Sequence, residues 1–564
     1  MCNRFDISVR EVEDNTMSKK LRFLVGLTAL LALILAPALH GAQDEPVLKW
    51  HTYAGSSMDE YGFGIAMDPS GNIYLAGWSD KTWGSPINPH SGGRDAFVAK
   101  LNNTGELQWN TFLGSSHTDE GKAIAVDGSG NVYVVGTSDA QWAIPGDPFP
   151  GGGWGTFLAK LDSNGELQWH RFMTTYGDQI GNDVAVDANG YVYVGGWGGW
   201  LWDTPPVEPF PDMDAAFVAK LDSSGVEVWH AFLGGEAQDV GTGIAVDASG
   251  HVYVTGWSEA TWGTPVNEYT VDGYQEGFVV KLDSSGKRQW HTFFGGAGQD
   301  QPWDIAVDTS GNVYVSGHST ANWGTPINPH AGGVWDAFVV KLDSSGVRQW
   351  HTFMGESMGW DIAVDGGQNV YVTGVGAAHP GYVAALNRDG VLQWNTFLEA
   401  CLENIALDRS RNFYVAGRID YSWGTPVNPW AGGWDAFVAK ISTQQTYAFS
   451  GFDRPVDNQP IVNNAKAGSA IPVKWQITDL DGTPVSDPAS FASLTSYSVG
   501  CGSFSDDPVD ELEEFSAGAS GLQYLGDGYW QFNWKTKKSY AGQCRIMALK
   551  LGDGSEHTAY FKFK

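Results

Sequence analysis

Seven copies of one motif, each about 60 residues long, occupy most of this chain. The motif consists of a strand with a marker tryptophan, a Gly/Asp loop, an apolar strand that ends in Asp, a tight turn, a tyrosine strand, a Trp-Pro loop and a Phe strand that ends in Lys. The sixth copy departs from it, because it lacks the Trp-Gly-x-Pro loop. The marker tryptophans are separated by 59, 60, 60, 61, 60 and 44 residues, so the sixth copy is shortened: Trp50, Trp109, Trp169, Trp229, Trp290, Trp350 and Trp394. A unit repeated in register predicts one structural element that stacks on its own copies.

Each copy is predicted to form four short strands, as the second copy shows. Its strands are expected at 123–127, 131–135, 156–161 and 167–172. They carry apolar residues on both faces, as expected for a sheet enclosed by two neighbouring sheets. Four antiparallel strands of this length form one blade of a β-propeller. With 73 Gly, 26 Trp and only 17% charged residues, the composition favours short strands and turns over helices. We therefore predict an all-β protein that contains a seven-bladed β-propeller.

The order of strands along the chain predicts how the ring closes. The repeat region starts with a lone fourth-type strand at 47–53. It ends with three strands and no fourth, at 404–408, 412–416 and 436–441. The N-terminal strand is therefore expected to complete the last blade.

The repeats resemble the seven-bladed β-propeller (SBBP) repeats of bacterial extracellular proteins. The matching segments include Gly243-Ile-Ala-Val-Asp-Ala-Ser-Gly-His-Val-Tyr-Val-Thr-Gly256 and Asp336-Ala-Phe-Val-Val-Lys-Leu-Asp-Ser-Ser-Gly346. The resemblance covers residues 47–442. The last two copies depart from it, since Gln368 and Arg411 replace the turn glycine. It implies an architecture and no particular activity.

A second domain is predicted at residues 449–564, after a propeller at 43–442 and a linker at 443–448. Alternating segments such as 471–477, 530–534 and 559–563 indicate a small β-sandwich. The domain resembles the immunoglobulin-like PxKF module of secreted bacterial proteins, on the segments 464–474, 534–537, 541–545 and 561–564. Cys501 and Cys544 lie in this domain, and export favours a disulfide between them. Cys401 is then expected to be a free, buried thiol.

The N-terminal 42 residues are predicted to be an upstream segment and a signal peptide. Residues 17–42 combine Lys19, Lys20 and Arg22 with an apolar run at 23–36 and small residues after it. Cleavage after Ala42 or Ala38 gives a secreted or cell-surface protein without a membrane span; an uncleaved anchor is the alternative. The net charge of −31 argues against nucleic acid as a partner. We expect a monomer that binds an extracellular protein or a polysaccharide.

Two sets of recurring residues are candidates for ligand binding on one face of the ring. Acidic residues precede the first strand of five blades, where they can surround one mouth of the ring or fix the amides of their own loops: Asp59, Asp119, Asp178, Asp239 and Asp300. Tryptophans of the Trp-Gly-x-Pro loops can contact a ligand or wedge between blades: Trp83, Trp262, Trp323 and Trp423, with variants at Trp142 and Trp202. The short loop at 377–381 predicts a gap among the loops on this face at the sixth blade.

Metal binding is not favoured by the sequence. The Asp-x-Ser-Gly turns at Asp68, Asp127, Asp247 and Asp308 offer too few oxygens for calcium, although calcium remains the one cofactor considered. The histidines that follow the marker tryptophans are expected to be solvated on outer strands and too dispersed to share an ion: His51, His170, His230, His291 and His351.

The sequence favours a non-catalytic binding or scaffold protein that uses the propeller as a platform. The alternatives are a carbohydrate-binding lectin and a glycosidase or lyase that acts on polysaccharides. The sequence has no nucleophile elbow, phosphate loop or zinc pair, and we predict no catalytic residue. The residues that break the repeat, Trp303-Asp304, Trp360-Asp361 and Glu399, form no recognisable set.

Overall fold

A computed structural model describes most of the chain and divides it into two compact units, Leu48–Ser442 and Thr443–Lys564. The described residues are 46–142, 149, 151, 153–173, 179–198, 205–211, 214–270, 274–376, 381–408, 412–443, 447–478, 484–486, 488–501, 513–516, 521–553 and 555–564. The predicted signal at 17–42 lies outside them. Among the described residues, no helix has the length and apolar character to cross a membrane.

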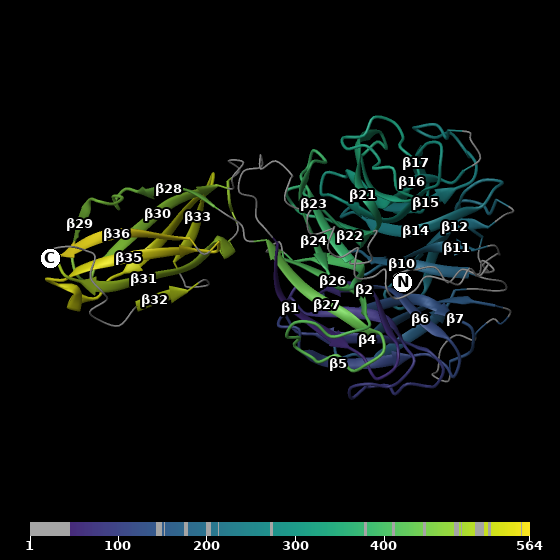
Figure 1. The fold of residues 1–564 in the computed structure, drawn as a ribbon, viewed down its shortest axis with the longest axis horizontal. Helices are drawn as coiled ribbons and strands as arrows, with labels where there is room; N and C mark the ends of the chain where they lie inside the picture. The colour runs from purple at the N-terminus through teal and green to yellow at the C-terminus, as the bar shows by residue number, and fades with distance from the viewer. Residues whose placement is uncertain are drawn as a thin grey trace, which may run out of the picture. The chain divides into compact units, whose positions relative to one another are not determined.

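The larger unit is a ring of seven four-stranded antiparallel blades, and successive blades follow the colour order of the chain (Figure 1). Blade 1 contains β2 (Glu60–Met67), β3 (Ile73–Ser79), β4 (Asp95–Leu101) and β5 (Leu107–Leu113). Blade 2 contains β6 (Asp119–Val126), β7 (Val132–Ser138), β8 (Gly155–Leu161) and β9 (Leu167–Phe172). Blade 3 contains β10 (Gln179–Val186), β11 (Val192–Gly198), β12 (Ala215–Leu221) and β13 (Glu227–Leu233). Blade 4 contains β14 (Asp239–Val246), β15 (Val252–Ser258), β16 (Glu276–Leu282) and β17 (Arg288–Phe294).

Blades 5 and 6 are joined by one continuous strand. Blade 5 contains β18 (Asp300–Val307), β19 (Val313–Ser319), β20 (Asp336–Leu342) and the first part of β21 (Arg348–Val364). The second part of β21 begins blade 6, which continues with β22 (Val370–Gly376), β23 (Gly381–Leu386) and β24 (Leu392–Leu398).

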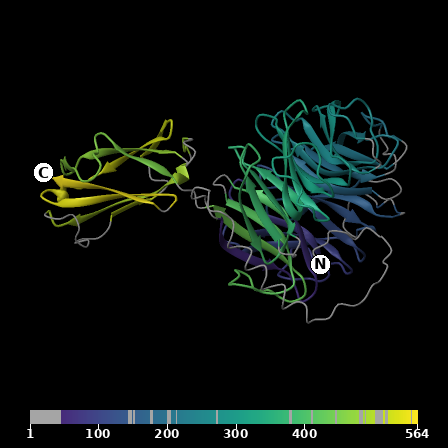
Figure 2. The same ribbon diagram turned by 45° about the horizontal axis from the view of Figure 1, so that its top comes forward.

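The N-terminal strand closes the ring, as predicted. Blade 7 contains β25 (Cys401–Leu407), β26 (Asn412–Ile419) and β27 (Asp435–Thr443), and β1 (Pro46–Ala54) is its fourth strand. Figure 2 shows the purple N-terminal strand among the green strands of this blade. The first strand of each blade, here called its inner strand, contacts the inner strands of both neighbouring blades, and β2 contacts β25.

Aliphatic and aromatic side chains fill the spaces between blades. The second-strand tyrosines, such as Tyr74 and Tyr133, are fully buried there. Each inner strand carries a β-bulge near its start, between Gly62 and Gly64 in blade 1. The partner strand must approach this bulge closely: a Cβ added at Gly77 would lie 1.8 Å from the carbonyl oxygen of Tyr61. Glycine recurs at this position because no other side chain fits.

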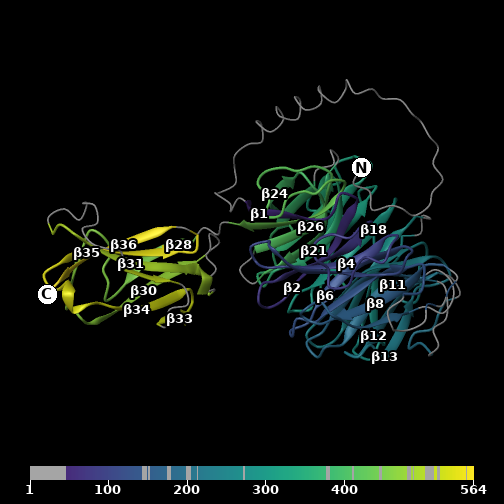
Figure 3. The same ribbon diagram turned by 90° about the horizontal axis from the view of Figure 1, so that it is seen from below.

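The C-terminal unit consists of two sheets that pack on a shared core (Figure 3). One sheet contains β28 (Ala448–Asp453), β30 (Ala470–Thr478), β34 (Tyr529–Lys535) and β33 (Leu522–Gly526). The other contains β29 (Val462–Ala465), β36 (Glu556–Phe563), β35 (Cys544–Leu551), β31 (Phe491–Val499) and β32 (Glu513–Ser516). Two short 3-10 helices, η1 (Pro488–Ser490) and η2 (Lys538–Tyr540), complete the unit. Trp475 and Trp534 are fully buried in its core.

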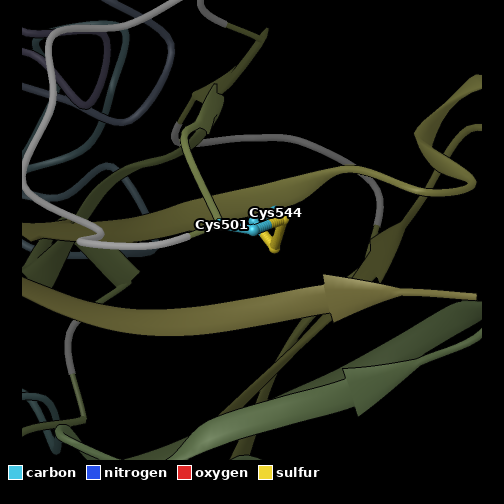
Figure 4. The surroundings of a disulfide bond; sticks show 2 residues. All are labelled: Cys501 and Cys544. Atoms are coloured by element: carbon cyan, nitrogen blue, oxygen red, sulfur yellow. A yellow bond between two sulfur atoms is a disulfide. The ribbon is translucent and has the colours of Figure 1, made fainter.

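The cysteines agree with one prediction and contradict another. Cys501 and Cys544 form the predicted disulfide, with Cα atoms 5.1 Å apart (Figure 4). The prediction of a free thiol at Cys401 is wrong, because Cys401 is disulfide-bonded and buried. That prediction removed Cys2 with the upstream segment and so left Cys401 without a partner. The other half of the Cys401 bond lies outside the described residues.

Candidate functional site

The two ends of each blade differ in chemistry. At one end, here called the turn end, short turns join the first strand to the second and the third to the fourth. At the other, here called the loop end, long segments join the second strand to the third, and the fourth strand to the next blade. Both sets of predicted ligand-binding residues lie at the loop end.

In the Asp turns at the turn end, the Asp carboxylate accepts hydrogen bonds from groups of its own turn and from the following strand. Asp68 accepts hydrogen bonds from the backbone N–H groups of Ser70 and Asn72, both at 2.9 Å, and from the Tyr74 hydroxyl at 3.1 Å. Asp127, Asp247 and Asp308 repeat this pattern. The carboxylate therefore has the turn-forming role that the sequence favours. Among the described residues, no group of three or more His, Cys, Asp or Glu side chains could hold a metal ion.

The loop tryptophans are anchors within their own blades. Trp83, Trp262 and Trp323 are only 7%, 6% and 4% exposed, and Trp423 is half-buried. Trp262 packs edge-on against Phe278 and Phe293 of the same blade, with ring centroids 5.8 and 5.7 Å apart. Trp262 thus fills space inside its own blade, whereas Trp323 also contacts Phe294 of blade 4, with ring centroids 6.3 Å apart, and so packs between blades as predicted. Because the buried tryptophans offer no free face, we do not include them in the candidate site.

The histidines that follow the marker tryptophans are buried, which corrects the prediction that they are solvated. Their exposure is 1–3% at His51, His170, His230, His291 and His351. His291 stacks on Trp262 with centroids 4.1 Å apart, and its Nε2 donates to the Trp262 carbonyl oxygen at 2.7 Å. Burial lowers the pKa of His291 to about 4, so the ring stays neutral and keeps this donor. The Trp-Pro loop covers the outer strand, which the sequence pattern of the strand alone does not reveal.

The loop acids fix the amides of their own loops. Asp119, Asp239 and Asp300 are at most 1% exposed. Their carboxylates accept the N–H groups of Ser115, Gly235 and Gly296 at 2.7, 2.7 and 2.8 Å. Burial raises the pKa of Asp239 to about 6. These three aspartates therefore hold the backbone of their own loops, which is one of the two predicted roles, and they do not form an exposed ring of charge.

Two of the predicted loop acids have a different place. In blade 1 the buried position belongs to Glu60, which accepts the Ser56 N–H at 2.7 Å. Asp59 is half-buried one residue earlier and accepts the N–H of Trp434 at 3.1 Å. Asp178 lies outside the described residues, and Gln179 begins the strand there. Both residues 59 and 60 are acidic, so the spacing alone could not choose between them.

A second set of buried acids begins the third strands, and the sequence analysis missed it. These residues are fully buried: Asp95, Glu276, Asp336 and Asp435. Asp435 and Glu60 approach each other across Gly55, since a Cβ added to that glycine would lie 2.7 Å from Asp435 Oδ1 and 2.6 Å from Glu60 Oε2. Burial raises the pKa of Asp435 to about 7, and the charge of Glu60 adds to this. The recurring acid before Ala-Phe-Val or Gly-Phe-Val is the sequence signal that identifies this set.

Aromatic and cationic side chains form a continuous stack across three blades at the loop end. The Arg418 guanidinium of blade 7 lies 4.2 Å from the Tyr61 ring centroid. Tyr61 stacks on Trp78 at 4.2 Å, and Arg94 lies 3.6 Å above Trp78. Arg94 then pairs with Glu120 of blade 2 at 2.7 Å. The buried end is neutralised by an Arg418–Glu403 ion pair at 3.2 Å.

A second network connects blades 4 and 5. Trp303 Nε1 donates to His318 Nδ1 at 2.9 Å, so His318 Nε2 carries the proton toward Gln301 Oε1 at 3.1 Å. Gln301 Nε2 in turn donates to Gln275. Burial lowers the pKa of His318 to about 3, which keeps the imidazole neutral.

Four of the five residues that break the repeat are brought together on adjacent inner strands, whereas Glu399 lies apart and accepts a hydrogen bond from the Tyr421 hydroxyl. Trp303 and Trp360 meet edge-on with centroids 5.0 Å apart. Asp304 and Asp361 are hydrogen-bonded to each other, and burial and the charge of Asp361 raise the pKa of Asp304. Asp361 also accepts the N–H of Ile405 from blade 7 at 2.6 Å. Sequence analysis singled out these residues but could not place them together.

The variable part of the loop end is a set of residue pairs, in which the second-strand member directly follows the recurring glycine of that strand. The pairs join the inner strand to the second strand, and the two most aromatic or polar ones are Tyr61–Trp78 and Gln301–His318. The other five pairs are Glu120–Thr137, Ile180–Trp197, Val240–Trp257, Met358–Val375 and Cys401–Arg418. Together with Trp335 and Trp434, which contact His318 and Tyr61, these pairs are here called the rim.

Comparison with known proteins agrees with this architecture. Residues 49–82, 108–141, 228–261 and 289–322 match the family model described as SBBP, a beta-propeller repeat. The chain is 26% identical over 355 residues to the regulatory protein FlaEY of Caulobacter vibrioides, covering 55% of this chain and 36% of that protein. It is 24% identical over 189 residues to an uncharacterized WD repeat-containing protein of Acanthamoeba polyphaga mimivirus, covering 27% of this chain and 14% of that protein. The chain thus spans well under half the length of either relative.

Similar solved structures share only low sequence identity. The Dos1 propeller is 12% identical with a TM-score of 0.41, covering 72% of this chain and 97% of that one. An ulvan lyase bound to a saccharide is 12% identical with a TM-score of 0.39, covering 68% and 97%. At these values neither likeness bears on function.

The strand topology defines a β-propeller protein with a separate C-terminal two-sheet unit. Four segments of the propeller match the SBBP repeat, in agreement with the sequence resemblance.

Proposed function

We propose that this is a secreted or cell-surface binding protein that uses its propeller as a rigid, non-catalytic platform and takes its ligand at the rim. One contrast carries the proposal. The rim pairs differ in all seven blades, whereas the corresponding pairs at the turn end are always aliphatic or aromatic: Met67–Ile73, Val126–Val132, Val186–Val192, Val246–Val252, Val307–Val313, Val364–Val370 and Leu407–Phe413. Varied side chains on a constant scaffold are typical of binding surfaces.

Carbohydrate is the ligand class that the rim favours, which makes a lectin the second candidate. Trp197 and Trp257, both half-buried, supply aromatic rings at the variable positions. Gln301 and Arg94 supply polar groups beside them. Catalysis is not proposed, because the loop acids Asp119, Asp239 and Asp300 are held by backbone amides.

A glycan array that includes bacterial polysaccharides tests both statements. The rim variant replaces Trp335 and Trp434, both half-buried, with Ala. The matched control replaces Ser284 and Ser344, exposed in the opposite turns, with Arg. We expect the rim variant to lose at least about tenfold in affinity and the control to bind as wild type. Equal binding by the rim variant, at an unchanged melting temperature, would contradict the rim as the site.

For the C-terminal unit we propose a PxKF-like module. Its support is the pair of sheets around a core that includes Trp475 and Trp534. Expression of residues 443–564 alone, followed by circular dichroism and thermal melting, tests whether the module folds by itself.

A further inference from the structure

In five blades, the loop between the second and third strands lies along the free edge of the outermost strand. In blade 1, Ile87 N–H donates to the Asn110 carbonyl at 2.9 Å, and Phe112 N–H donates to the Asn88 carbonyl at 3.2 Å. The same two bonds join loops to strands at Val207–Glu208, Val266–Asn267, Ile327–Asn328 and Val427–Asn428. Each loop thus acts as a short added strand on its blade.

Blade 6 has a much shorter connection at this place. Only residues 377–380 separate β22 from β23, which is too few to run along a further strand, and β24 is an edge strand among the described residues. Phe397 is 58% exposed, whereas its equivalents Phe112 and Phe353 are 1% and 2% exposed. Asn395, the equivalent of Asn110, is exposed too. Exposed apolar surface on an open edge strand is a site where another strand can pair.

We propose that the outer edge of β24 binds an extended segment of a partner protein by strand addition. This inference is independent of ligand binding at the rim. The five covered blades indicate the chemistry of the occupant, because four of their loops read Trp-Gly-Ser/Thr-Pro-Ile/Val-Asn, starting at Trp83, Trp262, Trp323 and Trp423. The partner segment therefore carries an aromatic residue, a proline, an aliphatic residue and an Asn-like residue in this order.

Each contact has a counterpart in blade 1. The Asn110 side chain donates to the Trp83 carbonyl at 2.9 Å, and Asn395 offers the same donor. The Asn88 N–H donates to Thr111 Oγ1 at 3.2 Å, and Thr396 occupies that register in blade 6. Trp83 packs edge-on against Phe112 with centroids 6.0 Å apart, which is the contact that Phe397 lacks. Backbone pairing supplies affinity in such complexes, and the side-chain seats supply specificity.

The test uses a synthetic peptide with the sequence of residues 322–330, Asn-Trp-Gly-Thr-Pro-Ile-Asn-Pro-His. Its binding to the full chain is measured by fluorescence anisotropy. A second peptide carries an N-methyl group on its isoleucine, which removes the N–H that pairs with the strand but keeps every side chain. We expect the first peptide to bind and the N-methylated peptide to lose about tenfold or more in affinity.

Two protein variants locate the binding. Phe397→Glu places a charge on the open edge and should reduce affinity at least about tenfold. Val228→Glu alters another exposed outer-strand side chain, 51% exposed in blade 3, and should leave binding unchanged. Failure of the peptide to bind, equal binding of the N-methylated peptide, or equal effects of the two variants would overturn the proposal. Self-association of the chain that Phe397→Glu abolishes would identify a second copy as the occupant, which would also overturn it.

Discussion

Asn404 Oδ1 in blade 7 accepts the backbone N–H of Ile65 in blade 1 at 3.0 Å. Three aspartates at the same repeat position make the equivalent bond to the next blade. Asp183 accepts Ile244 N–H at 2.8 Å, Asp304 accepts Ile362 N–H at 3.1 Å, and Asp361 accepts Ile405 N–H at 2.6 Å. Polar side chains therefore link neighbouring inner strands at four junctions, including the one that closes the ring.

Removing the Asn404 acceptor should weaken ring closure. Asn404→Ala leaves the N–H of buried Ile65 without its partner, so we expect a loss of about 1–3 kcal/mol in unfolding free energy. Urea denaturation followed by tryptophan fluorescence measures it. Asn404→Asp keeps an acceptor and is the control. If Asn404→Asp lowers the free energy of unfolding as much as Asn404→Ala does, loss of the hydrogen bond to Ile65 does not explain the effect of the Ala variant.

The stacked Trp323–His351 pair should be a major anchor of its loop. The rings lie 3.9 Å apart, and His351 Nε2 donates to the Trp323 carbonyl at 2.8 Å. Trp323→Ala should cost about 3–5 kcal/mol. His351→Asn should cost less, because Asn110 makes the same bond in blade 1. If the Asn variant is as unstable as the Ala variant in urea melts, the hydrogen bond does not anchor the loop.

The buried acid pair Glu60–Asp435 should make the free energy of unfolding fall as the pH rises toward neutrality. Burial raises the pKa of Asp435 to about 7 from its usual 3.8. The folded chain then holds a proton that the unfolded chain has released, so unfolding free energy decreases from about pH 4 to about pH 7. Asp435→Asn should flatten this slope and raise stability at pH 8 by roughly 1–3 kcal/mol.

Melting temperatures at pH 5 and pH 8 test this prediction. Asp389→Asn is the control, because the Asp389 side chain is 72% exposed. A pH dependence that Asp435→Asn leaves unchanged would exclude this carboxyl as its source.

The Cys501–Cys544 disulfide should stabilise the C-terminal unit alone. It closes a loop with a sequence separation of 43 residues, so a Cys501→Ser, Cys544→Ser double variant should lose about 2–5 kcal/mol. Calorimetry should show the loss in one of two transitions and leave the propeller transition in place. A shift in the propeller transition would contradict the independence of the two units.

Sequence periodicity predicted the blades well because every repeated apolar position faces the same environment in each blade. Sequence periodicity did not predict the burial or the contacts of residues whose surroundings come from another segment of the chain. The burial of His351 follows from the loop that carries Trp323, and the choice of Glu60 over Asp59 follows from the exact start of β2. The meeting of Asp304 with Asp361 depends on the contact between adjacent inner strands, which composition and spacing do not specify.

Because β21 continues without interruption from blade 5 into blade 6, the blade junctions should differ in their resistance to opening. At most junctions a loop separates the outer strand of one blade from the inner strand of the next. At the junction of blades 5 and 6 both are parts of β21, so detachment of the outer strand of blade 5 would also disturb the inner strand of blade 6. Blade 7 is the opposite case, because its outermost strand comes from the far end of the chain. We therefore expect a ring under strain to open beside blade 7 first, while blades 5 and 6 exchange their amide hydrogens as a single slow block.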